Sequence, residues 1–165
     1  MFVLICILLI CMVVNVFAVR GRKGQPGLEK LLDWSYAHRG LHDAQNPENS
    51  MAAFRAALQR GYGSELDVHL LKDGTLAVMH DSDLMRTTGQ KGTLEDLTLA
   101  DLQNYPLGGT QETIPTFRQV LDLFAGKAPL IVELKPYGKN ADRLTEAACK
   151  MLEGYPGEYC IESFD

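Results

Sequence analysis

Residues 65–81 read ELDVHLLKDGTLAVMHD and form the segment around which the other elements are arranged. Two runs rich in apolar residues flank the turn signal at 72–74, a pattern typical of a β-hairpin or of two strands joined by a tight turn. Residues two apart on a strand point to the same face, so Glu65 and Asp67 project together and their apolar neighbours take the other face. The segment therefore predicts a pair of hard oxygen ligands on one face of a strand.

A histidine near the end of this segment is expected to return to the same place. If the chain reverses at Asp73 and Gly74, the second strand runs back beside the first and brings His80 close to Glu65 and Asp67. A metal site and a proton-transfer group would then share one end of one element. The alternative is that the two carboxylates face solvent, as acidic residues of amphipathic strands usually do.

The composition indicates one globular domain of acidic character. A chain of 165 residues with 46% hydrophobic residues has room for about one domain with a buried core. The net charge of −5 at pH 7 argues against a nucleic-acid partner. The four cysteines show no zinc-type spacing, so we interpret them as reduced thiols.

The N-terminal end differs from the rest of the chain. Residues 1–19 carry no charged side chain and approach the length that spans a bilayer, which predicts a transmembrane anchor, with a cleaved signal peptide as the alternative. Residues 20–27 combine glycine, proline and positive charge and are expected to form a basic linker. By the positive-inside tendency, the domain at 28–165 is expected on the cytoplasmic side of a membrane, or outside the cell if the segment is a signal peptide.

Strand and helix signals alternate along the domain. The expected order is a strand at 35–37, a helix capped by Asn49 or Ser50, the hairpin, helical segments opening at Thr93 and Thr98, a helix after Thr116, a strand at 129–135, a helix at 140–154 and a strand at 159–164. Alternation of this kind predicts parallel strands with helical crossovers, an α/β fold.

Polar residues gather where the predicted strands end. In parallel α/β folds the active site forms at the carboxyl ends of the strands, and in (β/α)8 barrels almost without exception. The residues at these ends are His38 and Arg39, Glu65 and Asp67, Glu133 and Lys135, and Glu162.

These residue types suit a single reaction. Three carboxylates without cysteine or histidine at ligand spacing favour a hard divalent cation, Ca²⁺ or Mg²⁺. Arg39 and Lys135 suit a phosphate group. The two histidines, His38 and His80, can accept and donate protons near neutral pH. The combination indicates metal-assisted hydrolysis of a phosphodiester.

Eight motifs in order and at similar spacing resemble the glycerophosphodiester phosphodiesterases. They are His38-Arg39-Gly40, Pro47-Glu48-Asn49-Ser50, Glu65-Leu66-Asp67-Val68, Lys72-Asp73-Gly74, His80-Asp81, Arg86-Thr87-Thr88-Gly89, Ile114-Pro115-Thr116 and Val132-Glu133-Leu134-Lys135. The resemblance implies a TIM-type barrel that cleaves glycerophosphodiesters to sn-glycerol 3-phosphate and an alcohol. It also implies His38 and His80 as the acid/base pair, a metal held by Glu65, Asp67 and Glu133, and phosphate binding by Arg39 and Lys135.

Of this pair, His80 is expected to be the acid and His38 the base. The remaining histidines, His42 and His69, match no role in the family, and His69 is expected to be structural or to face solvent. Glu48 is expected to favour the dipole of the first helix. The role of Glu162 stays open.

The chain ends at a segment that looks like the fourth strand of such a barrel, so about four strand-helix units are expected. Open barrel edges would favour pairing with another chain, and a truncated gene product is one interpretation. The alternatives to glycerophosphodiester hydrolysis are a non-catalytic half-barrel that serves as an interaction fragment and a phospholipase-type phosphodiesterase acting on intact lipids.

Overall fold

The computed structural model of the chain describes residues 5, 12–14 and 27–165. The chain divides into two compact units, Met1–Leu32 and Asp33–Asp165. In the described part of the first unit, the short helix α2 covers Glu29–Leu32. The domain limit expected after residue 19 lies outside the described residues, and the limit expected after residue 27 lies at their edge. Both limits stay predictions.

The expectation of a membrane anchor, and with it of a membrane-anchored domain facing the cytoplasm, is corrected by the structure. Within residues 5, 12–14 and 27–165, no helix is long and apolar enough to cross a membrane. A spanning helix needs about 20 consecutive apolar residues. Helix α6 (Ala141–Leu152) has only 12 residues, and charged side chains alternate with its apolar ones. Most of the apolar run at 1–19 lies outside the described residues.

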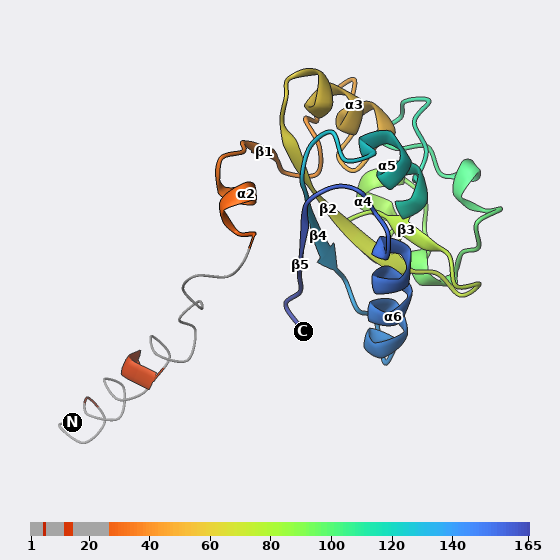
Figure 1. Cartoon of the computed structure of the whole chain (residues 1–165). Coiled ribbons are helices and arrows are strands. Elements are labelled where there is room, and N and C mark those ends of the chain that lie inside the picture. Colours follow the sequence, from red (N-terminus) through yellow and green to blue (C-terminus); the bar gives the residue numbers. More distant parts are fainter. Residues whose placement is uncertain (1–4, 6–11, 15–26) are drawn as a thin grey trace. The chain divides into compact units, whose positions relative to one another are not determined.

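The second unit is built on one sheet (Figure 1). Strands β1 (Tyr36–Ala37), β2 (Gly63–Leu70), β4 (Leu130–Leu134) and β5 (Tyr159–Glu162) pair in that order, and each pair is parallel. The predicted alternation of strands and helical crossovers is thereby confirmed.

The hairpin at 65–81 forms as the sequence predicts. Strand β3 (Leu76–Val78) runs antiparallel to the end of β2, with Val68 opposite Val78 and Leu70 opposite Leu76. The Gly74 amide donates to the Leu71 carbonyl, and Gly74 has a φ of 89°, a value that glycine adopts without strain. The chain therefore reverses at the expected turn and leaves β3 toward His80.

Three helices cover one face of the sheet (Figure 1). Helix α3 (Met51–Gln59) is capped by Ser50, whose hydroxyl accepts from the Ala53 amide, and α5 (Phe117–Phe124) begins with a capping box at Thr116. The apolar faces of these helices and of α6 pack on alternate residues of β2 and β4. This main core includes Phe54, Leu66, Val68, Phe117, Leu121, Phe124, Val132 and Leu144.

The segment between β3 and α5 makes an excursion with a core of its own. It contains α4 (Met85–Thr88) and two 3₁₀ helices, η1 (Leu94–Asp96) and η2 (Leu102–Asn104). Its small core buries Leu71, Ala77, Met79, Leu84, Leu94, Leu97, Leu102, Leu107 and Ile114. The helices expected from Thr93 and Thr98 are reduced to single 3₁₀ turns, and the buried pair Leu94 and Leu97 follows the three-residue repeat of that helix.

Candidate active site

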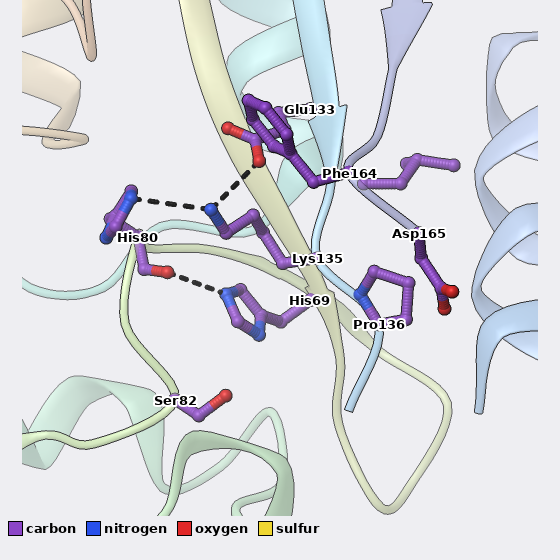
Figure 2. Close-up of a pocket in the computed structure, with 9 residues that line it drawn as sticks. His69, His80, Ser82, Glu133, Lys135, Pro136, Phe164 and Asp165 are labelled. Atoms are coloured by element: carbon purple, nitrogen blue, oxygen red, sulfur yellow. Dashed lines mark hydrogen bonds and ion pairs between the residues drawn. The ribbon is translucent and has the colours of Figure 1, made fainter. Parts of the chain in front are cut away.

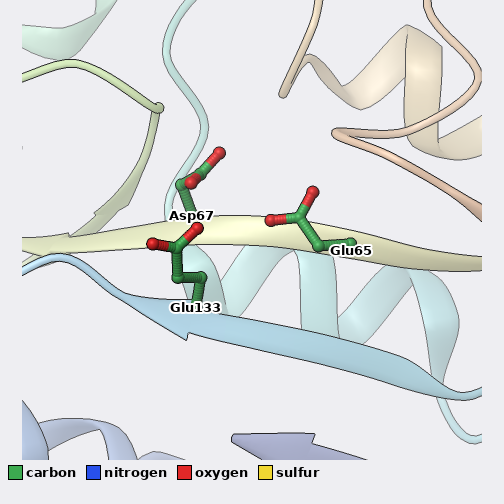
Figure 3. A group of neighbouring side chains, drawn as sticks. All are labelled: Glu65, Asp67 and Glu133. Carbon is green, nitrogen blue, oxygen red and sulfur yellow. The ribbon is translucent and has the colours of Figure 1, made fainter. Parts of the chain in front are cut away.

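Three buried carboxylates meet on the sheet face opposite the helices (Figure 3). Asp67 on β2 is in register with Glu133 on β4, and Glu65 lies two residues before Asp67 on the same face. One ligand oxygen from each residue lies within 4.8 Å of the other two. Only 7% of Glu65, none of Asp67 and 8% of Glu133 is exposed, which excludes the solvent-facing alternative.

Two cations lie beside this cluster but do not balance it. Lys135 Nζ donates to Glu133 Oε1 at 2.9 Å and lies 3.6 Å from Asp67 Oδ1, while Arg39 Nε lies 3.5 Å from Asp67 Oδ2. Asp67 Oδ1 is buried and accepts no hydrogen bond from the residues that the structure describes. Three carboxylate oxygens that lie this close together, one of them buried without a hydrogen bond, fit a divalent cation such as Ca²⁺ or Mg²⁺.

The same crowding affects the protonation of Glu65. Burial, and after it the negative charge of Asp67, raises the pKa of Glu65 to about 7, although the Arg39 backbone amide donates to its Oε2 at 2.9 Å. A positive charge placed among the carboxylates would remove much of this repulsion, because it would stabilise the ionised form.

A strained turn after β1 places Arg39 against the carboxylates. Arg39 has a φ of 55° and Asn49 a φ of 56°, both in the left-handed region that non-glycine residues rarely occupy. The Asn49 amide donates to the Arg39 carbonyl, and its side chain donates to Asp67 Oδ2 at 2.8 Å. Gly40 follows with no room for a side chain, since a Cβ would lie 2.8 Å from the Ala53 Cβ. The turn is thus fixed from both ends.

The two predicted histidines stand on different sides of the cluster. His38 follows β1, and its side chain is 69% exposed with Nε2 at 3.8 Å from Glu65 Oε2. His80 follows β3; its Nδ1 lies 2.6 Å from Asp81 Oδ1, and its Nε2 lies 3.4 Å from Lys135 Nζ. A neutral ring with its proton on Nδ1 satisfies both contacts, because Nε2 is then free to accept from the lysine.

An open cavity of about 370 Å³ adjoins His80, Lys135 and Glu133 (Figure 2). Figure 2 shows the lysine amine between the imidazole and the carboxylate, with its two contacts drawn as dashed lines. The cavity therefore brings together the Lys135 amine, the His80 imidazole and one carboxylate of the cluster, Glu133.

His69 is buried, which excludes the solvent-facing alternative and agrees with the structural one. It is 2% exposed, its Nδ1 lies 2.7 Å from Glu95 Oε1, and its Nε2 lies 3.2 Å from the His80 carbonyl oxygen. His42 is exposed in the loop after β1, and Glu162 is exposed on β5, in register with Glu133.

Three polar residues near the site were not assigned to it from the sequence. Asp81 contacts His80, Arg86 donates to Asp81, and Glu48, expected to favour a helix dipole, accepts instead from Arg39 and Arg86. The adjacency of Asp81 to His80 was a usable signal. The approach of Glu48 to Arg86, 38 residues apart, follows from the tertiary fold alone.

Comparison with known proteins agrees with this geometry. Residues 38–154 match the model of a family described as the glycerophosphoryl diester phosphodiesterase family. A glycerophosphodiester phosphodiesterase of Bacillus altitudinis is 41% identical over 108 residues, which cover 61% of this chain and 43% of that protein. One from Caldanaerobacter subterraneus subsp. tengcongensis is 43% identical over 108 residues, 60% of this chain and 44% of that protein. The chain thus spans less than half the length of these two curated relatives.

The structure is also similar to a solved phosphodiesterase of Oleispira antarctica in complex with the product sn-glycerol-3-phosphate. The TM-score is 0.76 at 30% identity, and the likeness covers 86% of this chain and 61% of that one. The predicted fold class is confirmed: an α/β fold of the TIM-type (β/α)8 barrel family, of which the described residues form an incomplete barrel with four parallel strands.

Proposed function

The chain belongs to the glycerophosphoryl diester phosphodiesterase family, and from this we propose that it hydrolyses glycerophosphodiesters to sn-glycerol 3-phosphate and an alcohol. The proposal rests on one observation: three buried carboxylates, two cationic side chains that can bind phosphate, and two histidines lie together at the carboxyl ends of the strands. A small-molecule phosphodiester is the substrate class that these groups suit.

Glu65, Asp67 and Glu133 would hold a divalent cation, Ca²⁺ or Mg²⁺. When bound, such a cation supplies positive charge to the phosphoryl oxygens and lowers the charge repulsion in the site. Asp67 Oδ1, which is buried and accepts no hydrogen bond from the described residues, and the raised pKa of Glu65 support this assignment.

Arg39 and Lys135 would bind the phosphodiester from two sides. The guanidinium group of Arg39 offers paired donors to two phosphoryl oxygens, and the Lys135 amine offers a compact charge. Both cations already contact the carboxylate cluster, so they would hold the phosphate beside it and neutralise charge that develops on its oxygens.

His80 and His38 would move the protons. The contacts of His80 favour the reverse of the division expected from the sequence, with His80 as base at Nε2, oriented by Asp81, and His38 as acid. His80 would take the proton from water or from the neighbouring glycerol hydroxyl; in the second case a cyclic phosphate forms, which water then opens to sn-glycerol 3-phosphate. The exposed His38 would protonate the departing alkoxide, which leaves toward solvent.

The direct test is the release of sn-glycerol 3-phosphate from glycerophosphocholine by the purified full chain with Ca²⁺ or Mg²⁺. We expect the rate of product formation to be proportional to protein concentration, and we expect a chelator to stop product formation. Product formation no faster than in buffer with the same cation would contradict the proposal and favour a non-catalytic role. Release of choline and acyl-glycerol 3-phosphate from intact lysophosphatidylcholine, without hydrolysis of glycerophosphocholine, would favour the phospholipase alternative.

The raised pKa of Glu65 predicts how stability depends on pH. The unfolded chain ionises this carboxyl near 4.5, whereas the folded chain keeps its proton until about pH 7. Between these values the folded state binds more protons, so the free energy of unfolding of the metal-free chain should fall as pH rises. A saturating divalent cation should remove this fall, because it takes the place of the proton.

Urea unfolding of the chain at a series of pH values, with and without cation, measures this effect. The Glu65→Gln variant has no titrating side chain at position 65. Its free energy of unfolding should therefore lack the fall with pH that the cation removes in the wild type. Stability that rises with pH between 5 and 7 in the metal-free wild type would refute the prediction.

A further inference from the structure

We propose that Glu48 is a positioning residue that couples the phosphate-binding Arg39 to His80 through Arg86 and Asp81. The inference rests on the proposed function for the roles of Arg39 and His80. Beyond that function, the inference assigns a role to Glu48, a carboxylate outside the cluster that would fix the positions of Arg39 and His80 together.

Glu48 accepts hydrogen bonds from two arginines that come from different parts of the chain. Its Oε1 accepts from Arg39 Nη1 at 3.1 Å and from Arg86 Nη2 at 2.6 Å, and its Oε2 accepts from Arg86 Nη1 at 3.0 Å. The two-point contact with Arg86 fixes the plane of both groups. Glu48 therefore holds the Arg39 guanidinium at Nη1, whereas Asp67 faces it at Nε.

Arg86 carries the connection to the histidine. While its two terminal nitrogens hold Glu48, its Nε donates to Asp81 Oδ2. The other oxygen, Asp81 Oδ1, lies 2.6 Å from His80 Nδ1. A continuous row of hydrogen bonds thus runs from Arg39 through Glu48, Arg86 and Asp81 to His80.

The charges along this row favour the ionised forms of its two carboxylates, Glu48 and Asp81. The Arg86 hydrogen bond, and after it the charges of Arg86 and Arg39, lowers the pKa of Glu48 despite burial. Burial alone would raise the pKa of Asp81, but hydrogen bonds from Arg86 and His80 lower it. Charge-assisted hydrogen bonds of this kind are shorter and more directional than neutral ones.

A purely structural role is a weaker explanation for this arrangement. About half of the Arg86 side chain is exposed, and exposed ion pairs contribute little to folding stability. The pair formed by Arg55 and Glu112 is a natural comparison, because Arg55 is equally exposed and Glu112 nearly as buried as Glu48. No contact of that pair with His80 or Arg39 is found among the described residues, so Arg55→Met reports the effect of losing an ion pair. Glu112 also accepts from the Ala52 amide at 2.9 Å, so Glu112→Gln reports the change of a carboxylate that holds both an arginine and a backbone amide.

The test compares Glu48→Gln and Arg86→Met with the control variants Glu112→Gln and Arg55→Met. In the divalent-loaded full chain, Glu48→Gln should lower kcat for glycerophosphocholine about 10- to 100-fold, the usual cost of removing an outer partner of a functional group, and should raise KM. The control variants should stay within about twofold of the wild type. The double variant of Glu48 and Arg86 should lose little more than the worse single variant, because both changes break the same row.

Arg86→Lys separates positioning from simple charge. Lysine keeps the positive charge but cannot contact Glu48 and Asp81 at the same time with a fixed fork. We expect Arg86→Lys to remain at least tenfold impaired in kcat. Full rescue by lysine, or losses in the Glu48 variant no larger than in the Glu112 control, would overturn the proposal.

Two measurements without turnover keep the inference separate from the proposed function. Calorimetric titration of sn-glycerol 3-phosphate into the divalent-loaded chain should show weaker binding for Glu48→Gln than for Glu112→Gln. In ¹⁵N-histidine NMR spectra, the ring signals of His80 should shift in Glu48→Gln and stay in place in Glu112→Gln. If the wild type is inactive while these differences appear, the proposed function fails and the coupling stands; if it is active while they are missing, the coupling fails.

Discussion

Replacing Asp67 with Ala is expected to abolish the divalent-dependent hydrolysis of glycerophosphocholine by the full chain. Asp67 is fully buried at the centre of the carboxylate cluster, in register with Glu133 and two residues from Glu65. Its loss removes the ligand that faces both of the others. Metal-ion stabilisation of phosphoryl charge contributes several kcal/mol, so a loss on the order of 10³-fold or more in kcat/KM is expected.

The measurement is the rate of sn-glycerol 3-phosphate release at saturating Ca²⁺ or Mg²⁺, together with calorimetric titration of the cation. Glu65→Ala and Glu133→Ala should show the same loss of activity and of cation binding. Asp122→Ala, which removes an exposed carboxylate on α5, serves as the control and should behave as the wild type. Full activity in the presence of a chelator would show that the carboxylates do not act through a metal.

The histidines should differ from each other when the leaving group is varied. On glycerophosphocholine, both His38→Ala and His80→Ala should lose on the order of 10² to 10⁴ in rate, since each removes one partner of general acid-base catalysis. A nitrophenyl ester of glycerol phosphate has a leaving group that departs without protonation. On this substrate His38→Ala should be nearly as active as the wild type, while His80→Ala should remain severely impaired.

Steady-state rates for the two variants on the two substrates give four values that decide the assignment. His42→Ala removes an exposed histidine of the same loop as His38 and provides the matched control. Equal losses of both variants on both substrates would exclude a division of labour. Rescue of His80→Ala instead of His38→Ala would restore His80 as the acid.

Strand periodicity and strand ends were sufficient to predict the inner part of the site. Glu65, Asp67 and Glu133 follow from alternate residues on two adjacent parallel strands, and His80 follows from the turn at Gly74. These placements depend on local geometry and on the rule that parallel strands end together. The sequence alone therefore contains them.

The outer part of the site depends on how the excursion between β3 and α5 folds back. Arg86 reaches Glu48 only because the segment around α4 packs against the loop after β1, and no periodic pattern encodes that contact. The same segment contains two short 3₁₀ helices, for which the capping signals at Thr93 and Thr98 predicted longer helices. Capping chemistry marks where a helix can begin, whereas packing of Leu94 and Leu97 decided how far it continued.

The two hydrophobic cores divide the site between two regions, and we expect the region with the smaller core to open more readily. The carboxylates lie on strands of the main core and Lys135 directly follows one of them, whereas His80, Asp81 and Arg86 belong to the excursion packed around the small core. Proteins unfold locally in cooperative units, and a unit with a small core opens at a lower free-energy cost than the whole domain. In such a partly opened state the chain would keep its cation ligands and lose its proton-transfer group, so that hydrogen exchange of the excursion would report the fraction of molecules competent for chemistry.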